Sequence, residues 1–297
     1  MNPRFNQLYD NLPSAHVDTF KGIFDSASFD GVLSPQQVQQ LQQCTSLDEQ
    51  ALKVTLLPFA AAFSIAPISK FNVGAIVKGS SNSLYFGANL EFSNVQLGQT
   101  VHAEQSAISH AWMKGEQEIV DITINFSPCG HCRQFMNELT SAQHLTVQLP
   151  AADAKSLQEY LPESFGPKDL GVESGLMSPI NHGFSSANDD PLLVEAISAL
   201  NKSHAPYTKN YSGVAIETLD GTTMHGSYAE NAAFNPSLPP LQVALVQLQM
   251  RGIDFSHIKQ VALAEINDAA MSHLADTQNT LEAINPDIAL TYIALDV

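Results

Sequence analysis

Two short segments of the chain carry side chains that can bind a transition metal. Glu104 lies two residues after His102, and Cys129 and Cys132 lie 27 and 30 residues after His102. One imidazole and two thiolates form a ligand set of the softness that zinc prefers. Three protein ligands leave the fourth tetrahedral position to water, and the Glu104 carboxylate is placed to take a proton from that water. The pattern predicts one catalytic zinc ion per chain, bound by His102, Cys129 and Cys132.

His131 and Cys44 are of the same residue types as the predicted ligands, but we do not expect them to bind the metal. His131 lies between the two cysteines, and we expect it beside the metal rather than on it, because three such close neighbours do not readily reach one ion. Cys44 ends a helical stretch and is expected to be a small core residue. Three cysteines, two of them in a C-x-x-C pair, argue against a disulfide framework and favour a reducing compartment.

The metal-binding segments open two predicted helices, at 101–115 and 132–140. Ala107, Ile108 and Ala111 recur at helical spacing in the first of these helices. A helix N-terminus carries partial positive charge, which stabilises a neighbouring thiolate. Both halves of the pattern are therefore expected at helix starts.

Alternating helices and strands predict an α/β layered fold with a mixed sheet. The Ser34-Pro35 pair predicts a helix start, and an apolar helix is expected over 48–65 with a kink or break at Pro58. Apolar runs bounded by turn residues predict strands at 71–78, 84–91, 119–127 and 144–149.

Composition along the chain predicts four parts. A helical N-terminal segment (1–47) precedes a catalytic domain (48–150), and a Gly-, Pro- and Ser-rich connecting segment (151–189) leads to a second α/β unit (190–297). The segment 205–216 resembles 66–76, and 226–236 resembles 87–94. We interpret the second unit as a duplicated copy, with chance similarity of two α/β units as the alternative.

The second copy lacks the residues that would carry chemistry. Pro239, Pro240 and Leu241 stand where the first copy has His102, Ala103 and Glu104, and no cysteine follows Cys132. We therefore expect the copy to be non-catalytic, and to help cover the active site and build a dimer interface.

The charge of the chain bears on its partners. The net charge is −17, from 13 basic and 30 acidic residues, without a local Lys/Arg cluster. Such a surface repels a phosphate backbone, so nucleic acid is not an expected partner and a small uncharged substrate is. The first residues lack the apolar core of a signal peptide, and no stretch is long and apolar enough to span a membrane. We expect a cytoplasmic protein without a membrane partner.

The order H-x-E followed by P-C-x-x-C is the recorded signature of the zinc deaminases. With FNVGA, GANLEFSN, HAEQSA, SPCGHCRQF and SFGPKDL, the chain resembles, nearly end to end, the long homodimeric bacterial cytidine deaminases. The resemblance implies two three-layer α/β/α domains with mixed sheets, the second degenerate, plus an N-terminal helical segment. It also implies deamination of free cytidine and 2′-deoxycytidine as part of pyrimidine salvage, by a homodimer whose active site lies near the subunit interface.

The resemblance also implies individual roles. Glu104 would move protons, first to N3 of the base and then to the leaving amine. The Ala103 N–H would meet the pyrimidine O2, and the Ser127 carbonyl would meet the amino group. Asn89 and Glu91 would bind the ribose hydroxyls, chiefly the 3′-OH. Phe71 would pack on the base and Phe165 would reach the partner subunit's site.

Simpler interpretations of these residues remain open at this point. Phe71 could be an ordinary core residue at the start of a strand, and Phe165 a local anchor. Asn89 and Glu91 alternate on a predicted strand, which also suits a solvated edge. A deaminase acting on RNA or DNA, a non-catalytic zinc module, and a deaminase of another small pyrimidine are the alternative functions.

Overall fold

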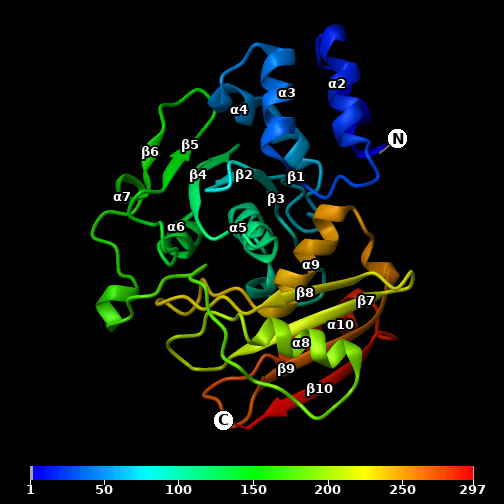
Figure 1. The fold of residues 1–297 in the computed structure, drawn as a ribbon, viewed down its shortest axis with the longest axis vertical. Coiled ribbons are helices and arrows are strands. Elements are labelled where there is room, and N and C mark those ends of the chain that lie inside the picture. The colour runs from blue at the N-terminus through cyan, green and yellow to red at the C-terminus, as the bar shows by residue number, and fades with distance from the viewer. Residues whose placement is uncertain (1–2, 297) are drawn as a thin grey trace.

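The computed structural model describes residues 3–296, which form two sheet-based units stacked along the long axis of the molecule (Figure 1). The first unit contains a six-stranded sheet in the order β1-β3-β2-β4-β5-β6, in which β4 and β5 are parallel and the other neighbours antiparallel. Its strands are β1 (Val32–Leu33), β2 (Gly74–Gly79), β3 (Leu84–Ala88), β4 (Ile119–Ile124), β5 (Thr146–Gln148) and β6 (Lys155–Ser156).

Helices α4 (Glu49–Ala61) and α5 (Ala103–Met113) cover opposite faces of this sheet. Two glycines allow the close contact: a Cβ on Gly74 would lie 2.5 Å from the Ala61 nitrogen of α4, and a Cβ on Gly87 would lie 2.1 Å from the Ala107 nitrogen of α5. Gly87 of β3 pairs with Ala75 of β2, and paired residues share one face of the sheet. Gly74, the residue before Ala75, therefore points to the opposite face, so the two helices lie on opposite faces. The predicted three-layer arrangement is present. Helix α6 (Gly130–Met136) packs beside α5.

The second unit repeats this arrangement around the sheet β10-β9-β7-β8, in which β10 and β9 are parallel. A Cβ on Gly213 would meet α8, and a Cβ on Gly226 would meet α9, again from opposite faces. The elements are α8 (Pro191–Leu200), β7 (Ser212–Thr218), β8 (Thr223–Ser227), α9 (Pro240–Arg251), β9 (Ile258–Ile266), α10 (Leu274–Ile284) and β10 (Ala289–Leu295).

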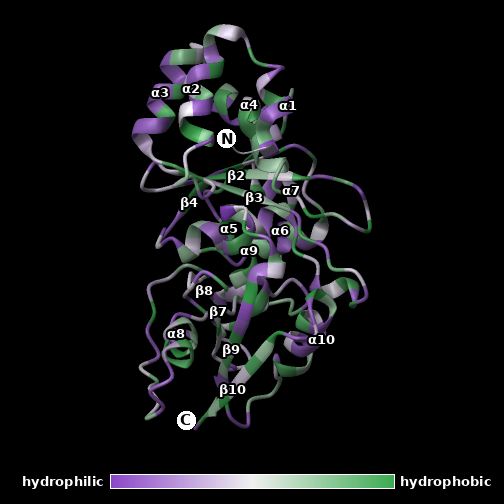
Figure 2. Ribbon diagram, turned by 90° about the vertical axis from the view of Figure 1, so that its right-hand side faces the viewer, coloured by the Kyte–Doolittle hydropathy of each residue, from purple (hydrophilic) through white to green (hydrophobic). Residues whose placement is uncertain are grey.

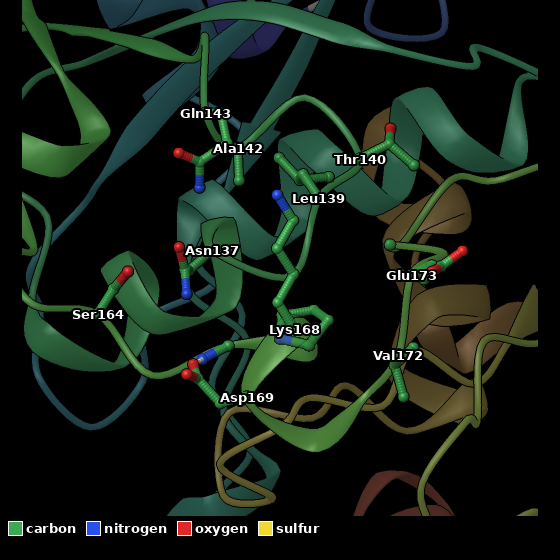
Figure 3. A pocket seen from close by; sticks show the side chains of 13 residues that line it. Asn137, Leu139, Thr140, Ala142, Gln143, Ser164, Lys168, Asp169, Val172 and Glu173 are labelled. Atoms are coloured by element: carbon green, nitrogen blue, oxygen red, sulfur yellow. Dashed lines mark hydrogen bonds between the residues drawn. The ribbon is translucent and has the colours of Figure 1, made fainter.

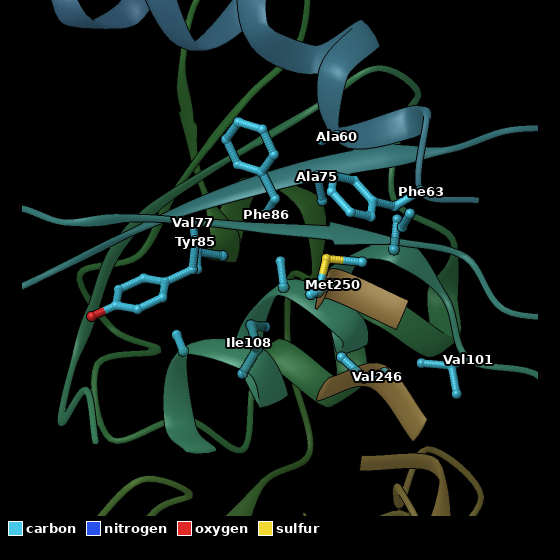
Figure 4. Close-up of a cluster of buried hydrophobic side chains, with 14 of the residues drawn as sticks. Ala60, Phe63, Ala75, Val77, Tyr85, Phe86, Val101, Ile108, Val246 and Met250 are labelled. Carbon is cyan, nitrogen blue, oxygen red and sulfur yellow. The ribbon is translucent and has the colours of Figure 1, made fainter. Parts of the chain in front are cut away.

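Helices α5 and α9 pack against each other between the two sheets. Val246 and Met250 of α9 lie with Phe63, Phe86 and Val101 of the first unit (Figure 4), and all belong to one buried apolar cluster. A smaller cluster fills the space between α8 and the second sheet. The main hydrophobic core therefore extends across the boundary between the units.

The N-terminal segment is helical, as predicted. Ser34 caps α3 by accepting a hydrogen bond from the Gln37 N–H, and Phe5, Phe24 and Phe59 form an aromatic cluster beneath the helices. Figure 2 shows the polar outer residues of α3, whose buried side is Val38 and Leu41. The elements are η1 (Pro3–Phe5), α1 (Asn6–Tyr9), α2 (Ser14–Phe24) and α3 (Pro35–Thr45).

Several local predictions differ from the structure. Helix α4 runs through Pro58 without a break and ends at Ala61. Strand β3 ends at Ala88, three residues before the predicted end, and Leu90 forms only isolated bridges to Ile65 and Val101. Cys44 is half-buried rather than in the core; the buried residues of α3 are Val38 and Leu41.

The segment 151–189 is mostly irregular, as predicted, but contains short elements. These are β6, α7 (Leu157–Tyr160) and η3 (Pro167–Leu170). Two further 3-10 turns are η2 (Leu97–Gln99) and η4 (Phe255–His257). Within residues 3–296, no helix has the length and apolar character needed to cross a membrane.

Candidate metal centre and adjoining cavity

The three predicted metal ligands meet where α5 and α6 begin. His102 immediately precedes α5, and Cys129 immediately precedes α6, which contains Cys132. His102 Nδ1 lies 3.2 Å from Cys132 Sγ and 3.4 Å from Cys129 Sγ, and the two sulfurs are 3.6 Å apart. The three donor atoms thus lie within 4.8 Å of one another, as ligands of one ion must.

The chemistry of this donor set fits a divalent ion. The hydrogen bond from Cys132 lowers the pKa of Cys129 to about 4, while the same bond and burial raise the pKa of Cys132. Two sulfurs and an imidazole nitrogen are donor types that zinc prefers, and a zinc ion would bind both sulfurs as thiolates. His131 is half-buried and stacks on the His102 ring at 5.3 Å, outside the ligand group.

Glu104 lies in the first turn of α5, directly beside the ligands. Its side chain is 5 % exposed, and burial raises its pKa, although a hydrogen bond with Cys132 and the nearby His102 act in the opposite direction. Ala103 is the first residue of α5, where a backbone N–H has no partner within the helix. The start of α5 therefore presents a carboxyl group and a backbone donor side by side.

An open cavity of about 270 Å³ adjoins the metal-binding residues. Eight of the predicted site residues line it, and the metal ligand Cys129 is one of them. Cys132 is buried and does not line the cavity. Its lining residues are Ser69, Phe71, Val73, Asn89, Glu91, Thr100, His102, Ala103, Glu104, Phe126, Ser127 and Cys129.

Polar groups at one end of the cavity are held by the loop that precedes β2. Glu91 accepts hydrogen bonds from the Ile68 and Ser69 N–H groups, both at 2.9 Å, and from the Ser69 hydroxyl. Burial alone would raise the pKa of Glu91, but these bonds hold it below its usual range. Asn89 and Glu91 are both buried, so the solvated-edge interpretation is wrong.

Asn89 fixes the same loop through its side-chain amide. Its Oδ1 accepts from the Ser64 hydroxyl at 2.6 Å and from the Val73 N–H at 2.9 Å, and its Nδ2 donates to the Phe71 carbonyl at 2.9 Å. Phe71 lies in this loop rather than in a strand, and its exposed ring contacts Phe126 with centroids 4.5 Å apart. Phe71 is therefore a cavity wall and not a core residue.

Phe165 does not line the cavity of its own chain. Its ring is 47 % exposed, while its backbone carbonyl accepts hydrogen bonds from Gln134 and Asn137, which lie in α6 and directly after it. A separate cavity of about 290 Å³ lies between the segments 137–143 and 164–175 (Figure 3), and none of its lining residues is a predicted site residue.

Four cavity residues were not predicted from the sequence: Ser69, Val73, Thr100 and Phe126. All four stand within two residues of a predicted site residue, since Ser69 and Val73 flank Phe71, Thr100 precedes His102 and Phe126 precedes Ser127. A wider search around the predicted residues could therefore have found them. The Ser69 and Val73 N–H groups also bind Glu91 and Asn89.

The corresponding region of the second unit keeps one carboxylate and loses the metal ligands. Glu230 accepts hydrogen bonds from the Tyr207 and Thr208 N–H groups, much as Glu91 accepts from Ile68 and Ser69. Pro239 precedes α9 where His102 precedes α5, and Leu241 replaces Glu104. Among residues 3–296, the only group of three close His, Cys, Asp or Glu ligands is His102, Cys129 and Cys132.

Both units match a family model described as the cytidine and deoxycytidylate deaminase zinc-binding region, over residues 45–147 and 157–278. The chain is 61 % identical over 295 residues to a cytidine deaminase of Vibrio atlanticus, covering 99 % of this chain and 100 % of the relative. It is 60 % identical over 293 residues to a cytidine deaminase of Vibrio parahaemolyticus, covering 99 % of each. A crystal structure of cytidine deaminase from Mycobacterium tuberculosis is 29 % identical and covers 36 % of this chain and 89 % of its own, with a TM-score of 0.34.

Proposed function

This chain belongs to the zinc-dependent cytidine deaminase family, and we propose that it hydrolyses free cytidine and 2′-deoxycytidine to the corresponding uridines and ammonia. The observation that carries the proposal is the buried Glu104 carboxyl group beside His102, Cys129 and Cys132, in the lining of an open cavity to which Asn89 and Glu91 also contribute.

When bound by His102, Cys129 and Cys132, a zinc ion supplies the Lewis acidity that makes water a nucleophile near neutral pH. Glu104 takes the first proton of the attacking water and delivers it to N3 of the base, as oxygen adds to C4. It then transfers the second water proton to the amino group, so that the C4–N bond breaks and ammonia leaves. Water and cytidine thus become uridine and ammonia, with Glu104 returned to its initial state.

The remaining predicted residues would bind and orient the nucleoside. The Ala103 N–H donates to the pyrimidine O2, the Ser127 carbonyl accepts from the amino group, and Phe71 packs on the base. Asn89 and Glu91 bind the ribose, chiefly its 3′-OH. The support is their position in the one cavity that also contains Glu104. Neither ribose residue is cationic, so a free nucleoside suits the cavity better than a 5′-nucleotide.

The direct test is an ultraviolet absorbance assay with cytidine, run on the native protein and on Glu104→Ala. We expect native turnover, and a loss of about 10²- to 10⁴-fold or more in a variant that still contains one zinc ion per chain. Native protein that holds zinc but does not convert cytidine would overturn the substrate. Equal turnover by the variant would overturn the role of Glu104.

The proposed assembly is a homodimer in the cytoplasm, acting in pyrimidine salvage, with Phe165 of one subunit at the active site of the other. Phe71, Phe126 and Phe165 are all exposed in the single chain, and a second copy could cover them. A reducing compartment would keep Cys129 and Cys132 available as metal ligands.

Subunit mixing tests the role of Phe165. Inactive Glu104→Ala chains supply an intact Phe165, and Phe165→Ala chains supply an intact Glu104. If Phe165 acts across the interface, hybrid dimers contain one complete site and activity returns on mixing. If the activity stays at the sum of the two separate variants although hybrids form, Phe165 acts in its own subunit or not at all.

A further inference from the structure

Gln249 of α9 hydrogen-bonds the backbone of Phe63 and of the cavity residue Asn89. It belongs to the second unit, and its side chain is 2 % exposed. The Nε2 group donates to the Phe63 carbonyl at 2.9 Å and to the Asn89 carbonyl at 3.1 Å. Both partners are carbonyl acceptors, so the orientation of the amide is fixed by chemistry.

The two carbonyls lie at the ends of the elements that frame the ribose end of the cavity. Phe63 follows α4, and Asn89 follows β3 at the point where the chain leaves the sheet. The Asn89 carbonyl also accepts from the Ile65 N–H at 3.0 Å. Gln249 therefore connects Phe63, at the start of the loop 62–73, with Asn89. The Asn89 side chain in turn binds Phe71 and Val73, at the end of the same loop.

The loop that Gln249 contacts also carries residues predicted to bind the nucleoside. Asn89 fixes the Phe71 carbonyl through its Nδ2, and the Ser69 N–H fixes Glu91. Within residues 3–296, the Gln249 amide donates to Phe63 and Asn89 and makes no hydrogen bond to the metal ligands or Glu104. Its contribution is confined to the ribose end.

The position of α9 is itself well determined. Met250, the residue after Gln249, is buried in the apolar cluster with Phe63 and Phe86 (Figure 4). This packing holds the helix against the first unit without the amide, so removing the amide should loosen the loop rather than detach the helix.

We propose that Gln249 is a positioning residue through which the non-catalytic unit sets the geometry of the ribose-binding end. The proposal rests on the proposed function and deepens it. A merely structural glutamine would affect stability without changing which substrate groups are recognised.

The test compares Gln249→Met with Gln247→Met, measured with cytidine and with 2′,3′-dideoxycytidine, which lacks the 2′-OH and the 3′-OH. Gln247 lies on the same helix, is 5 % exposed, and its Nε2 has no hydrogen-bond partner among the described residues. It is therefore a matched control with the same change of side chain.

We expect Gln249→Met to raise KM for cytidine about fivefold to tenfold, the effect of one lost buried hydrogen bond, with kcat within about twofold of native and zinc content unchanged. The fold increase in KM for 2′,3′-dideoxycytidine should be at most half as large. Gln247→Met should behave like the native protein with both substrates. Gln249→Asn, a smaller perturbation, should shift KM in the same direction, and it supplies the measurement if Gln249→Met does not fold.

Three results would overturn the proposal. One is a KM for cytidine that is native-like in both Gln249 variants. Another is an equal loss with both substrates, and the third is a loss of zinc or kcat without a change in KM. Each of these requires an active native protein, so they are distinct from the failure of the proposed function, in which native protein and Gln247→Met both leave cytidine unchanged.

Discussion

The two units of this protein have the same scaffold but different chemical content. Gly74 and Gly213 allow a helix to contact one face of each sheet, and Gly87 and Gly226 allow a helix to contact the other. In contrast, His102 and Glu104 of the first unit correspond to Pro239 and Leu241 of the second. The packing of the fold therefore depends on small residues at helix–sheet contacts, and the chemistry depends on a few side chains at helix starts, so one can be lost without the other.

The largest expected effect would come from removing a metal ligand, which should make the first unit as inert as the second. Cys129→Ala should lose the bound zinc and nearly all deaminase activity, because two protein ligands do not complete a tetrahedral site. Metal analysis and turnover of cytidine measure this. Cys44→Ala is the matched control, since Cys44 is a half-buried free thiol outside the ligand group, and it should keep both properties. A Cys129→Ala chain with native zinc content would contradict the ligand assignment.

The second prediction concerns the contact between the units. Glu138 is fully buried and accepts hydrogen bonds from His204 Nε2 at 2.9 Å, the Tyr207 hydroxyl at 2.7 Å and the Ala232 N–H at 2.9 Å, all in the second unit. Glu138→Ala would leave three donors without this acceptor, two of them on buried residues and the Tyr207 hydroxyl on a half-buried one, so we expect a loss of about 3 kcal/mol or more in unfolding free energy. Urea denaturation measures it.

The exposed Glu173 provides the control for Glu138. Glu173→Ala should unfold at nearly the native midpoint. If Glu138→Ala also unfolds at the native midpoint, the carboxylate does not hold the units together, and the apolar contact of α5 with α9 suffices.

The third prediction tests whether the scaffold is equally strict in both units. A Cβ on Gly87 would lie 2.1 Å from the Ala107 nitrogen, and one on Gly226 would lie 2.3 Å from the Pro240 oxygen. Each alanine variant should lose about 1–3 kcal/mol in unfolding free energy, because backbone must move apart. Gly22→Ala in α2 meets nothing within 4 Å and should gain about 0.5–1 kcal/mol. A stable Gly226→Ala would show that the second unit has relaxed its packing.

The last prediction is a pH dependence that both units share. Burial lowers the pKa of His110 in the first unit and of His273 in the second to about 4, from 6.5. Between these values the unfolded chain binds protons that the folded chain does not, so stability should fall as pH drops from about 6.5 toward about 4. The slope is up to about 1.4 kcal/mol per pH unit for each histidine.

Thermal unfolding measured across this pH range checks the histidine prediction. His273→Gln should reduce the slope of unfolding free energy against pH by the contribution of one histidine. The slope that remains should include the contribution of His110. An unchanged slope in His273→Gln would mean that the imidazole is not held neutral in the folded state.

The sequence was sufficient to predict the layered arrangement of helices and sheet and the duplication of the unit. It was not sufficient to predict the residues at which helices and strands end. The Ser34-Pro35 pair and the apolar spacing in α5 report local preferences, and these were reliable. Of the kink or break predicted at Pro58, the break is absent, because the flanking residues Leu57 and Phe59 are buried and hold the helix on both sides. Tertiary packing outweighed the local cost of the proline.

The sequence by itself determined the identities and order of the metal-binding residues, their position at two helix starts, and the loss of those residues from the second copy. These are local patterns or repeats, which can be read along the chain. Only the tertiary structure decided that Phe71 pairs with Phe126, that Phe165 lies outside the cavity of its own chain, and that Gln249 supports Asn89. Such contacts join residues as much as 160 positions apart, and no local propensity records which distant groups will meet when the core closes.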